Sequence, residues 1–310
     1  MPQAILEFVY ELRRQVFLHK RFHGTGSKRN PSLYVCLDGV KQLDLEGALI
    51  LAAELDRIRL VMKFKPLLDD GGWDPGVRAV LHALGVYDVI NAGRMSNHVP
   101  IDDYAGTLEQ VGLSVVRFQS DTEAAGAKAK ELRDNIYNLC EPPSGSKRPV
   151  YESLFEACLN AVQHAYPADQ PGDGLPRAKR WWAGALVDRA RGYLYLVVYD
   201  QGVGIPATLP ARTWWNVLRG QLPELTDAAI IQGSLEFGRS GVDVDGRGNG
   251  LWRMCALTDS FDEADVRFTS SKGQVDYVKG GFSQRATLQT RFCGTMIRWR
   301  AKVDVQEPPQ

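Results

Sequence analysis

The sequence predicts an α/β protein with two units, and three observations support this class. The chain has 310 residues, more than a single hydrophobic core usually holds. Strand-like apolar runs alternate with helix-like segments in its first third, as in a small α/β domain. Farther on, two β-like runs, Trp181–Asp188 and Tyr193–Asp200, follow a long helical segment. We therefore expect a small α/β domain over residues 31–119 and a larger one over residues 120–302.

Regular elements are expected throughout the first 119 residues. Apolar residues recur at helical spacing over residues 4–18, so an N-terminal helix and a linker are expected over residues 1–30. The elements expected next are a strand over 33–37, a helix over 45–60, a strand within 61–68 and a helix from Pro75 to Leu84. Pro75 is typical of a first helical turn, and Gly85 of the position after a helix end.

The larger domain is expected to begin with a helix capped by Asp121, which ends before a proline-rich loop over residues 141–149. The remaining elements expected are a helix over 151–166, the two β-like runs, strands over 286–292 and 295–300, a mobile loop over 206–244 and a disordered tail over 303–310.

The composition shows no charge bias. Lysine and arginine number 37, as do aspartate and glutamate, so no net field attracts nucleic acid or acidic lipid. No apolar run approaches the ~20 residues of a membrane-spanning helix, and the N-terminus lacks the pattern of a secretion signal. The five cysteines are dispersed, which favours reduced thiols over disulfides or a zinc site. We expect a cytoplasmic protein that binds neither nucleic acid nor a membrane.

Four polar residues, Glu152, Glu156, Asn160 and His164, recur every four positions and so share one helix face. Such a stripe is most often a solvated face, but an amide and an imidazole are poor choices for solubility alone. The Asn160 carboxamide oxygen suits Mg2+, which takes few protein oxygens. Glu156, one turn away, could deprotonate or orient a nucleophile.

A second group follows the strand that ends at Asp200. Its carboxylate can accept a hydrogen bond from an exocyclic amino group, which the O6 of guanine does not offer. Gly202 and Gly204, before Ile205, permit positive φ and close approach of a base to the backbone. A strand followed by a glycine turn is the plain structural alternative.

A third group is the glycine-rich segment that leads into an expected helix over residues 251–257. The amides of Gly246, Gly248 and Gly250, before Leu251, can cradle an anion at that helix start. Arg247 and Arg239 are then candidates to screen phosphate charge. A surface loop is the alternative. The sequence contains no GxxxxGK[ST] motif, which excludes a P-loop.

In this order, the three groups resemble the N, G1 and G2 boxes of the Bergerat-fold (GHKL) ATPases. The run from Glu156 to Tyr166 is most similar to the bacterial anti-sigma-factor serine kinases. The resemblance covers residues 120–302 and implies an α/β sandwich with a mixed sheet, a mobile lid, and ATP with Mg2+ as cofactors. It implies Glu156 as general base, Asn160 as metal ligand, Asp200 as adenine partner and Thr295 as a residue that closes the adenine pocket.

Residues 31–119 more weakly resemble a STAS domain, the partner fold of those kinases; a generic small α/β domain is the alternative. The phosphorylated turn of STAS antagonists corresponds here to Asp44-Leu45-Glu46-Gly47, which has no hydroxyl group. This domain is therefore expected to dock or regulate rather than accept phosphate.

Three functions follow from these patterns. The leading one is an ATP-binding regulatory protein with Mg2+-dependent ATPase or protein serine/threonine kinase activity. The second is a nucleotide-gated interaction module that binds ATP without turnover, and the third is a structural protein without a nucleotide. A protein partner or phosphoacceptor is expected, and the sequence leaves a homodimer open.

Overall fold

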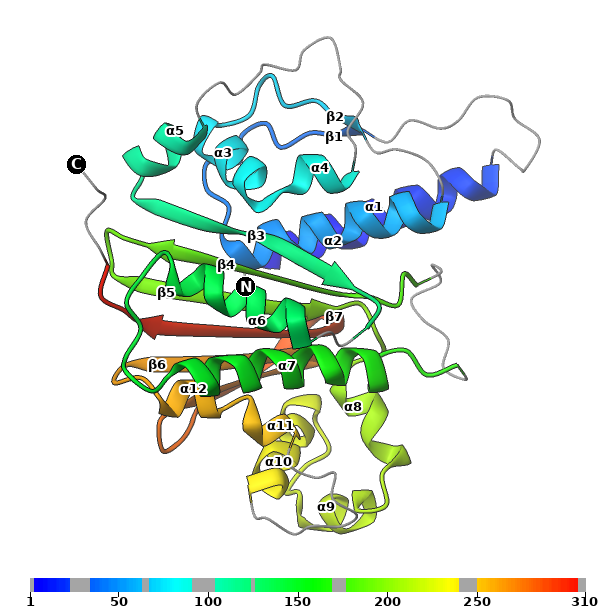
Figure 1. Cartoon of the computed structure of the whole chain (residues 1–310). Coiled ribbons are helices and arrows are strands. Elements are labelled where there is room, and N and C mark those ends of the chain that lie inside the picture. Colours follow the sequence, from blue (N-terminus) through cyan, green and yellow to red (C-terminus); the bar gives the residue numbers. More distant parts are fainter. Residues whose placement is uncertain are drawn as a thin grey trace.

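The computed structural model of the chain describes residues 3–22, 34–62, 67–90, 104–123, 126–168, 177–239 and 250–305. Its centre is a sheet with helices on both faces (Figure 1). No helix in this described part combines the length and apolar character needed to cross a membrane. None of the five cysteines, all of which are described, forms a disulfide, as expected from their dispersion.

The central sheet has five strands in the order β3-β4-β5-β7-β6. Their bounds are Leu113–Asp121 for β3, Trp181–Asp188 for β4, Tyr193–Asp200 for β5, Ala264–Val278 for β6 and Gly281–Lys302 for β7. The predicted bounds of β4 and β5 are confirmed. The sheet was expected to be mixed, and this is wrong: every pairing in it is antiparallel.

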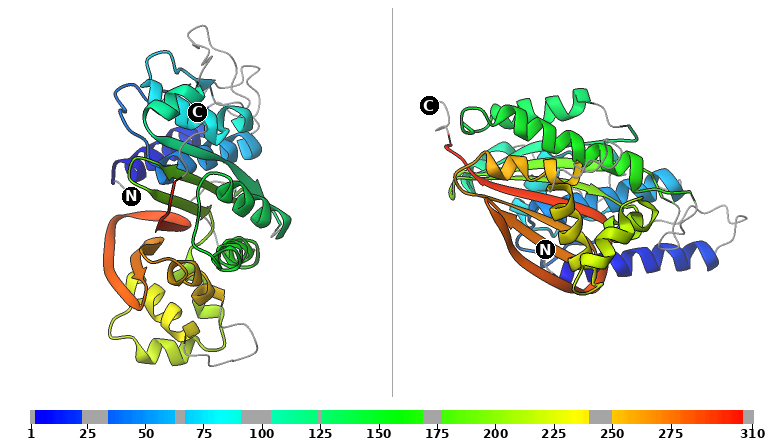
Figure 2. Two further views of the ribbon diagram at one scale, coloured as in Figure 1. Left: turned by 60° about the vertical axis from the view of Figure 1, so that its left-hand side comes forward. Right: turned by 90° about the horizontal axis from the view of Figure 1, so that it is seen from below.

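The β6–β7 hairpin differs most from the expected strands. The two strands expected over 286–292 and 295–300 are parts of β7, and β6 was not expected at all. Its sequence contains serines, a glycine and several charges in place of an apolar alternation. The hairpin bends at Ser271, which has a φ of 55°, and the pairing register shifts there. The bend brings Arg267 and Asp276 of the same strand into a bidentate ion pair. Figure 2 shows the hairpin curling around the neighbouring helices.

One face of the sheet is covered by helices that follow β3 in the chain. They are α6 (Gly126–Tyr137), α7 (Lys147–His164), α10 (Asp227–Arg239) and α12 (Ala256–Asp259). Alternate strand residues such as Ala183, Leu196 and Trp299 form the core on this side, because successive side chains of a strand point to opposite faces. β4 is buried along its whole length, which explains its nearly continuous apolar sequence.

The other face is covered by the N-terminal part of the chain. Its elements are α1 (Gln3–Phe22), β1 (Tyr34–Val35), α2 (Leu45–Met62), β2 (Leu67–Leu68), α3 (Pro75–Leu84), α4 (Val86–Ile90) and α5 (Tyr104–Gln110). Trp182, Val197 and Tyr199 of the sheet share one core with α2 and α3. The helices expected from residue 45 and from Pro75 are confirmed; Gly85 ends α3 with a φ of 85°.

The expected boundary between residues 119 and 120 falls inside β3, which pairs with β4. Among its described residues, the expected small domain has only a two-stranded parallel sheet of its own, β1 with β2. Helix α2 is buried on all sides from Leu45 to Ile58, as expected for a helix between layers. Asp44 caps it through the amide of Gly47. The N-terminal part is therefore a layer on the central sheet.

Three other expectations are corrected. Asp121 ends β3 and accepts the amide of Thr122, while α6 begins at Gly126. Helix α7 begins at Lys147, four residues before the expected start. The segment 206–239 is mostly helical rather than a loop, and the described elements there are α8 (Ile205–Thr208), the 3-10 helix η1 (Leu209–Ala211), α9 (Trp215–Gln221) and α10. The expected linker over 23–30 and residues 306–310 of the expected tail lie outside the described residues.

Candidate functional site

A cavity of about 80 Å³ lies where α7, the end of β5, the middle of β7 and the segment after β5 meet. Eight residues that the sequence pattern selected line it: Asn160, His164, Asp200, Gly204, Ile205, Gly250, Leu251 and Thr295. They come from segments 160–164, 200–205, 250–251 and 295, so the fold brings together groups up to 135 residues apart in sequence (295 − 160).

Helix α7 contributes the amide and the imidazole to this cavity. The Asn160 side-chain Nδ2 donates to the Glu156 carbonyl oxygen over 2.8 Å. That bond orients the amide and leaves its Oδ1 as an acceptor. His164 lies one turn farther along the same wall. Glu152 is an i, i+4 partner of Arg148 at 2.6 Å, as on an ordinary solvated helix face.

Glu156 is held by an ion pair. Its Oε1 lies 2.9 Å from Nη1 of Arg253 at the end of α11 (Gly250–Arg253), and its side chain is only 13% exposed. A Cβ added to Gly250 would lie 3.0 Å from Glu156 Oε2. Glycine at this position therefore lets the backbone of α11 lie directly over the Glu156 carboxylate.

Asp200 lies at the buried end of β5 and is 7% exposed. Its Oδ1 accepts the Gly202 amide over 2.8 Å. Burial raises the pKa of the Asp200 carboxyl from 3.8 to about 7, although hydrogen bonds from the amides of Gly202 and Thr295 and the charge of Arg177 lower it. The cavity therefore contains a carboxyl group that titrates near neutral pH, which is common at functional sites.

The glycines around Asp200 are required by close backbone contacts. A Cβ on Gly202 would lie 2.2 Å from the carbonyl oxygen of Ala165, just after α7. Gly204 has a φ of 89°, and a Cβ there would lie 2.6 Å from Oγ of Ser270. Ser270, which the sequence reasoning missed, accepts the Ile205 amide and donates to the Gly294 carbonyl oxygen, both over 2.9 Å. It joins β6, β7 and the loop after β5.

The third sequence group is described only in part. Gly246, Arg247 and Gly248 lie outside the described residues. The helix expected over 251–257 is instead two short helices, α11 and α12, separated by two residues. Arg239 lies over the Trp252 ring at 5.2 Å and is not among the residues that line the cavity.

The segment 205–214 adds cavity residues that the sequence reasoning did not select: Thr208, Leu209, Arg212 and Trp214. Trp214 also stacks on Phe237 of α10 with ring centroids 4.9 Å apart. The signal for Arg212 and Trp214 was the Arg-Thr-Trp-Trp run over residues 212–215, in a stretch that otherwise resembled a loop.

No protein-family model matches the chain, and a comparison with curated proteins finds no match.

Proposed function

We propose that this chain is an ATP-binding regulatory protein with Mg2+-dependent ATPase or protein serine/threonine kinase activity of the anti-sigma-factor kinase type. The observation that carries the proposal is the meeting of Asn160, Asp200 and Gly250, from three sequence groups, around one cavity. Patterns on solvated surfaces would not converge in this way. The resemblance to Bergerat-fold ATPases supplies the chemistry assigned to these residues.

The described residues fit an adenine nucleotide and its metal. The buried Asp200 carboxyl is an acceptor for an exocyclic amino group, and an added donor there would offset the cost of its burial. Asn160 Oδ1 is a neutral oxygen of the kind that Mg2+ accepts. The metal supplies charge stabilisation to the phosphates; Glu156 would take the proton of the attacking hydroxyl or water at its carboxylate.

ATP binding requires the cavity to enlarge. Its volume of about 80 Å³ is below the ~300 Å³ at which pockets for small molecules begin. Leu251 of α11 and Trp214 lie on its wall, and α11 lies against Glu156 through Gly250 and Arg253. We infer that a nucleotide enters as α11 moves away from α7, which breaks the Arg253–Glu156 pair.

The proposal predicts Mg2+-dependent ATP binding that requires Asn160. Asn160→Ala is expected to remove most of the affinity that Mg2+ adds, about tenfold or more, because one metal ligand is lost. Isothermal titration of ATP with Mg2+ and with EDTA measures this. Gln163→Ala, at an exposed position of the same helix, is the control and should bind as wild type. A wild-type protein that binds no ATP would overturn the proposal.

The Arg253–Glu156 pair favours the second function, a nucleotide-gated interaction module, because Arg253 occupies the Glu156 carboxylate while α11 lies against α7. Arg253→Met separates the two functions. If Glu156 is the base, freeing it is expected to raise phosphate release or transfer about three- to tenfold, and Glu156→Ala added to it should abolish the gain. Arg148→Met removes a comparable pair on the same helix and should change nothing. Equal, negligible turnover in all variants that bind ATP would support the gated module.

A further inference from the structure

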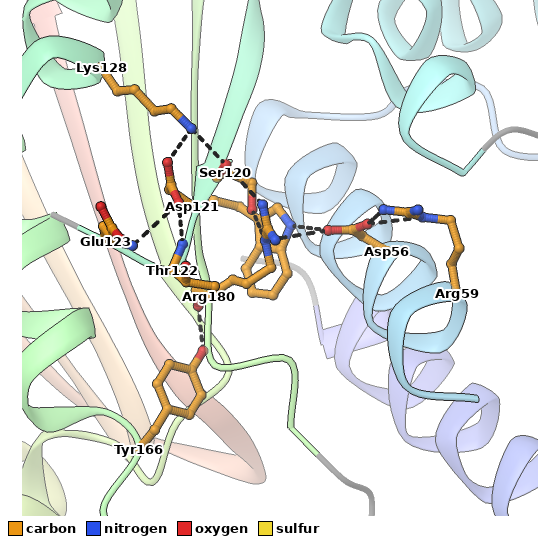
Figure 3. A network of polar contacts seen from close by, with 10 residues as sticks. Asp56, Arg59, Ser120, Asp121, Thr122, Glu123, Lys128, Tyr166 and Arg180 are labelled. Atoms are coloured by element: carbon orange, nitrogen blue, oxygen red, sulfur yellow. Dashed lines mark hydrogen bonds and ion pairs between the residues drawn. The ribbon is translucent and has the colours of Figure 1, made fainter. Parts of the chain in front are cut away.

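Helix α2 buries charged side chains against the central sheet. Glu54, Asp56 and Arg57 are each no more than 2% exposed. Buried charges require partners, and Asp56 has them near the start of β4: Trp182 Nε1 donates to it over 3.2 Å and Arg180 Nε lies 4.0 Å away. Figure 3 shows Arg180 between Asp56 and Ser120. This side of α2 is therefore tied to the sheet by polar contacts.

Glu54 makes the contact that reaches the candidate site. It pairs with Arg13 of α1, whose Nε lies 3.0 Å from Glu54 Oε2 and whose Nη2 contacts Oε1. The same Oε1 accepts Nε2 of Gln201 over 2.8 Å. Gln201 directly follows Asp200 in the chain. Glu54 therefore contacts the residue next to the one whose carboxyl group lines the cavity.

Strand geometry explains why neighbouring residues reach opposite layers. Side chains alternate along β5, so Val198 and Asp200 face the cavity, whereas Tyr199 packs with α2 and Gln201 bonds to it. The backbone N–H of Gln201 donates to the Tyr166 hydroxyl over 3.0 Å. That hydroxyl donates to the Arg180 carbonyl oxygen (Figure 3). The backbone of Gln201 is thus held by Tyr166, just after α7, and the Gln201 side chain is held by Glu54 of α2.

We propose that Glu54 is a positioning residue for Asp200 and acts through Gln201. Its carboxylate, fixed by Arg13, holds the Gln201 amide and thereby the turn that aims Asp200 into the cavity. The proposal rests on the proposed function, since Asp200 recognises the adenine amino group there. It makes the N-terminal layer part of the nucleotide site rather than a separate docking domain.

Besides its bond to Glu54, the Gln201 side chain has few polar contacts that fix its orientation. It is 2% exposed, and within the described residues its Oε1 has no hydrogen-bond partner. An unsatisfied buried acceptor is costly and calls for an explanation. The bond from Nε2 to Glu54 is therefore the polar contact that sets the orientation of this side chain.

The test is the discrimination between ATP and inosine triphosphate, which lacks the amino group. Gln201→Met keeps the shape but removes the donor. We expect about tenfold weaker ATP binding, less than twofold change for inosine triphosphate, and so a reduced ratio of the two affinities. Arg13→Met with Glu54→Leu removes the charged pair together and should reduce the ratio equally. When this double substitution is combined with Gln201→Met, the ratio of the two affinities should not fall further.

Gln232→Met is the matched control, because Gln232 also donates to a glutamate over 2.8 Å, but on the exposed side of α10. It should leave both affinities unchanged. A Gln201→Met protein with a lower melting temperature and the wild-type ATP preference would show a merely structural role and overturn the inference. If Arg13→Met with Glu54→Leu does not fold, Gln201→Met decides alone. Wild-type protein that binds neither nucleotide ends the proposed function and this inference together, an outcome distinct from binding without a Gln201 effect.

Discussion

Asp200→Asn is expected to lower ATP affinity at least about 100-fold while it stabilises the ligand-free protein at pH 8. The loss arises because the asparagine oxygen can accept the Gly202 amide, as Asp200 Oδ1 does, only if its NH2 group takes the place of the other carboxylate oxygen. A donor then faces the donor of the ligand. Calorimetric titration of wild type and variant measures the loss. Unchanged ATP binding in the variant would show that Asp200 does not contact the base.

The gain in stability follows from the raised pKa of Asp200. A pKa of 3.8 in the unfolded chain and about 7 in the folded one means that the folded state binds the proton more tightly. This contribution to stability is complete below pH 4 and is lost as pH rises through about 7. At pH 8 the wild type carries a buried carboxylate, at a cost of up to about 4 kcal/mol. The variant has no such group.

Thermal unfolding across pH checks this expectation. The melting temperature of Asp200→Asn should exceed that of wild type by several degrees at pH 8, and the difference should shrink toward zero near pH 4. ATP affinity of the wild type should rise from pH 6 to pH 8, since the ionised carboxyl is the better acceptor. A variant that is less stable than wild type at pH 8 would contradict the assignment of burial as the cause of the pKa shift.

Gly294→Ala is expected to have the largest effect on stability, about 4 kcal/mol or more. Gly294 lies within β7 with a φ of 90°, and an added Cβ would lie 1.8 Å from the Asp200 carbonyl oxygen. Neither backbone can retreat, because β5 and β7 pair along their whole shared length up to Asp200 and Thr295. Chemical denaturation measures the loss.

Gly280→Ala measures the cost of a left-handed backbone alone, without the steric clash that is present at Gly294. Gly280 has a φ of 97°, but a Cβ there meets nothing within 4 Å. Its replacement should cost only about 1 kcal/mol, the usual penalty for a left-handed backbone. Equal effects of the two substitutions would show that the contact between Gly294 and Asp200 is not tight, and that β7 is only loosely constrained beside the cavity.

The sequence predicted the elements whose patterns are local. β4 and β5 are apolar and bounded by turns, and Pro75 and Gly85 delimit α3, so local chemistry decides these bounds. β6 was missed because its bend depends on pairing with β7, and the helices over 205–239 because tertiary contacts such as Trp214 on Phe237 stabilise them. The pairing of β3 with β4, 60 or more residues away, has no local signal, so the boundary expected near residue 119 falls inside β3.

The candidate site was likewise predicted only where its residues form a local pattern in the sequence. Spacing alone grouped Asn160 with His164, and a strand followed by glycines identified Asp200. Ser270, Arg212 and Gln201 were not selected, because a single serine, arginine or glutamine carries no pattern. Their contacts depend on how β6, the segment after β5 and α2 meet. Sequence spacing therefore identified the groups that face the cavity but not those that hold them.

The burial of α2 on every side from Leu45 to Ile58 bears on how this chain can be divided. A fragment that kept the sheet but lacked α1 and α2 would expose Trp182, Val197 and Tyr199, which are at most 1% exposed in the whole chain. Apolar surface of that kind drives aggregation. The N-terminal residues therefore shield this apolar face of the sheet from solvent, and truncation is a poor route to an isolated C-terminal fragment.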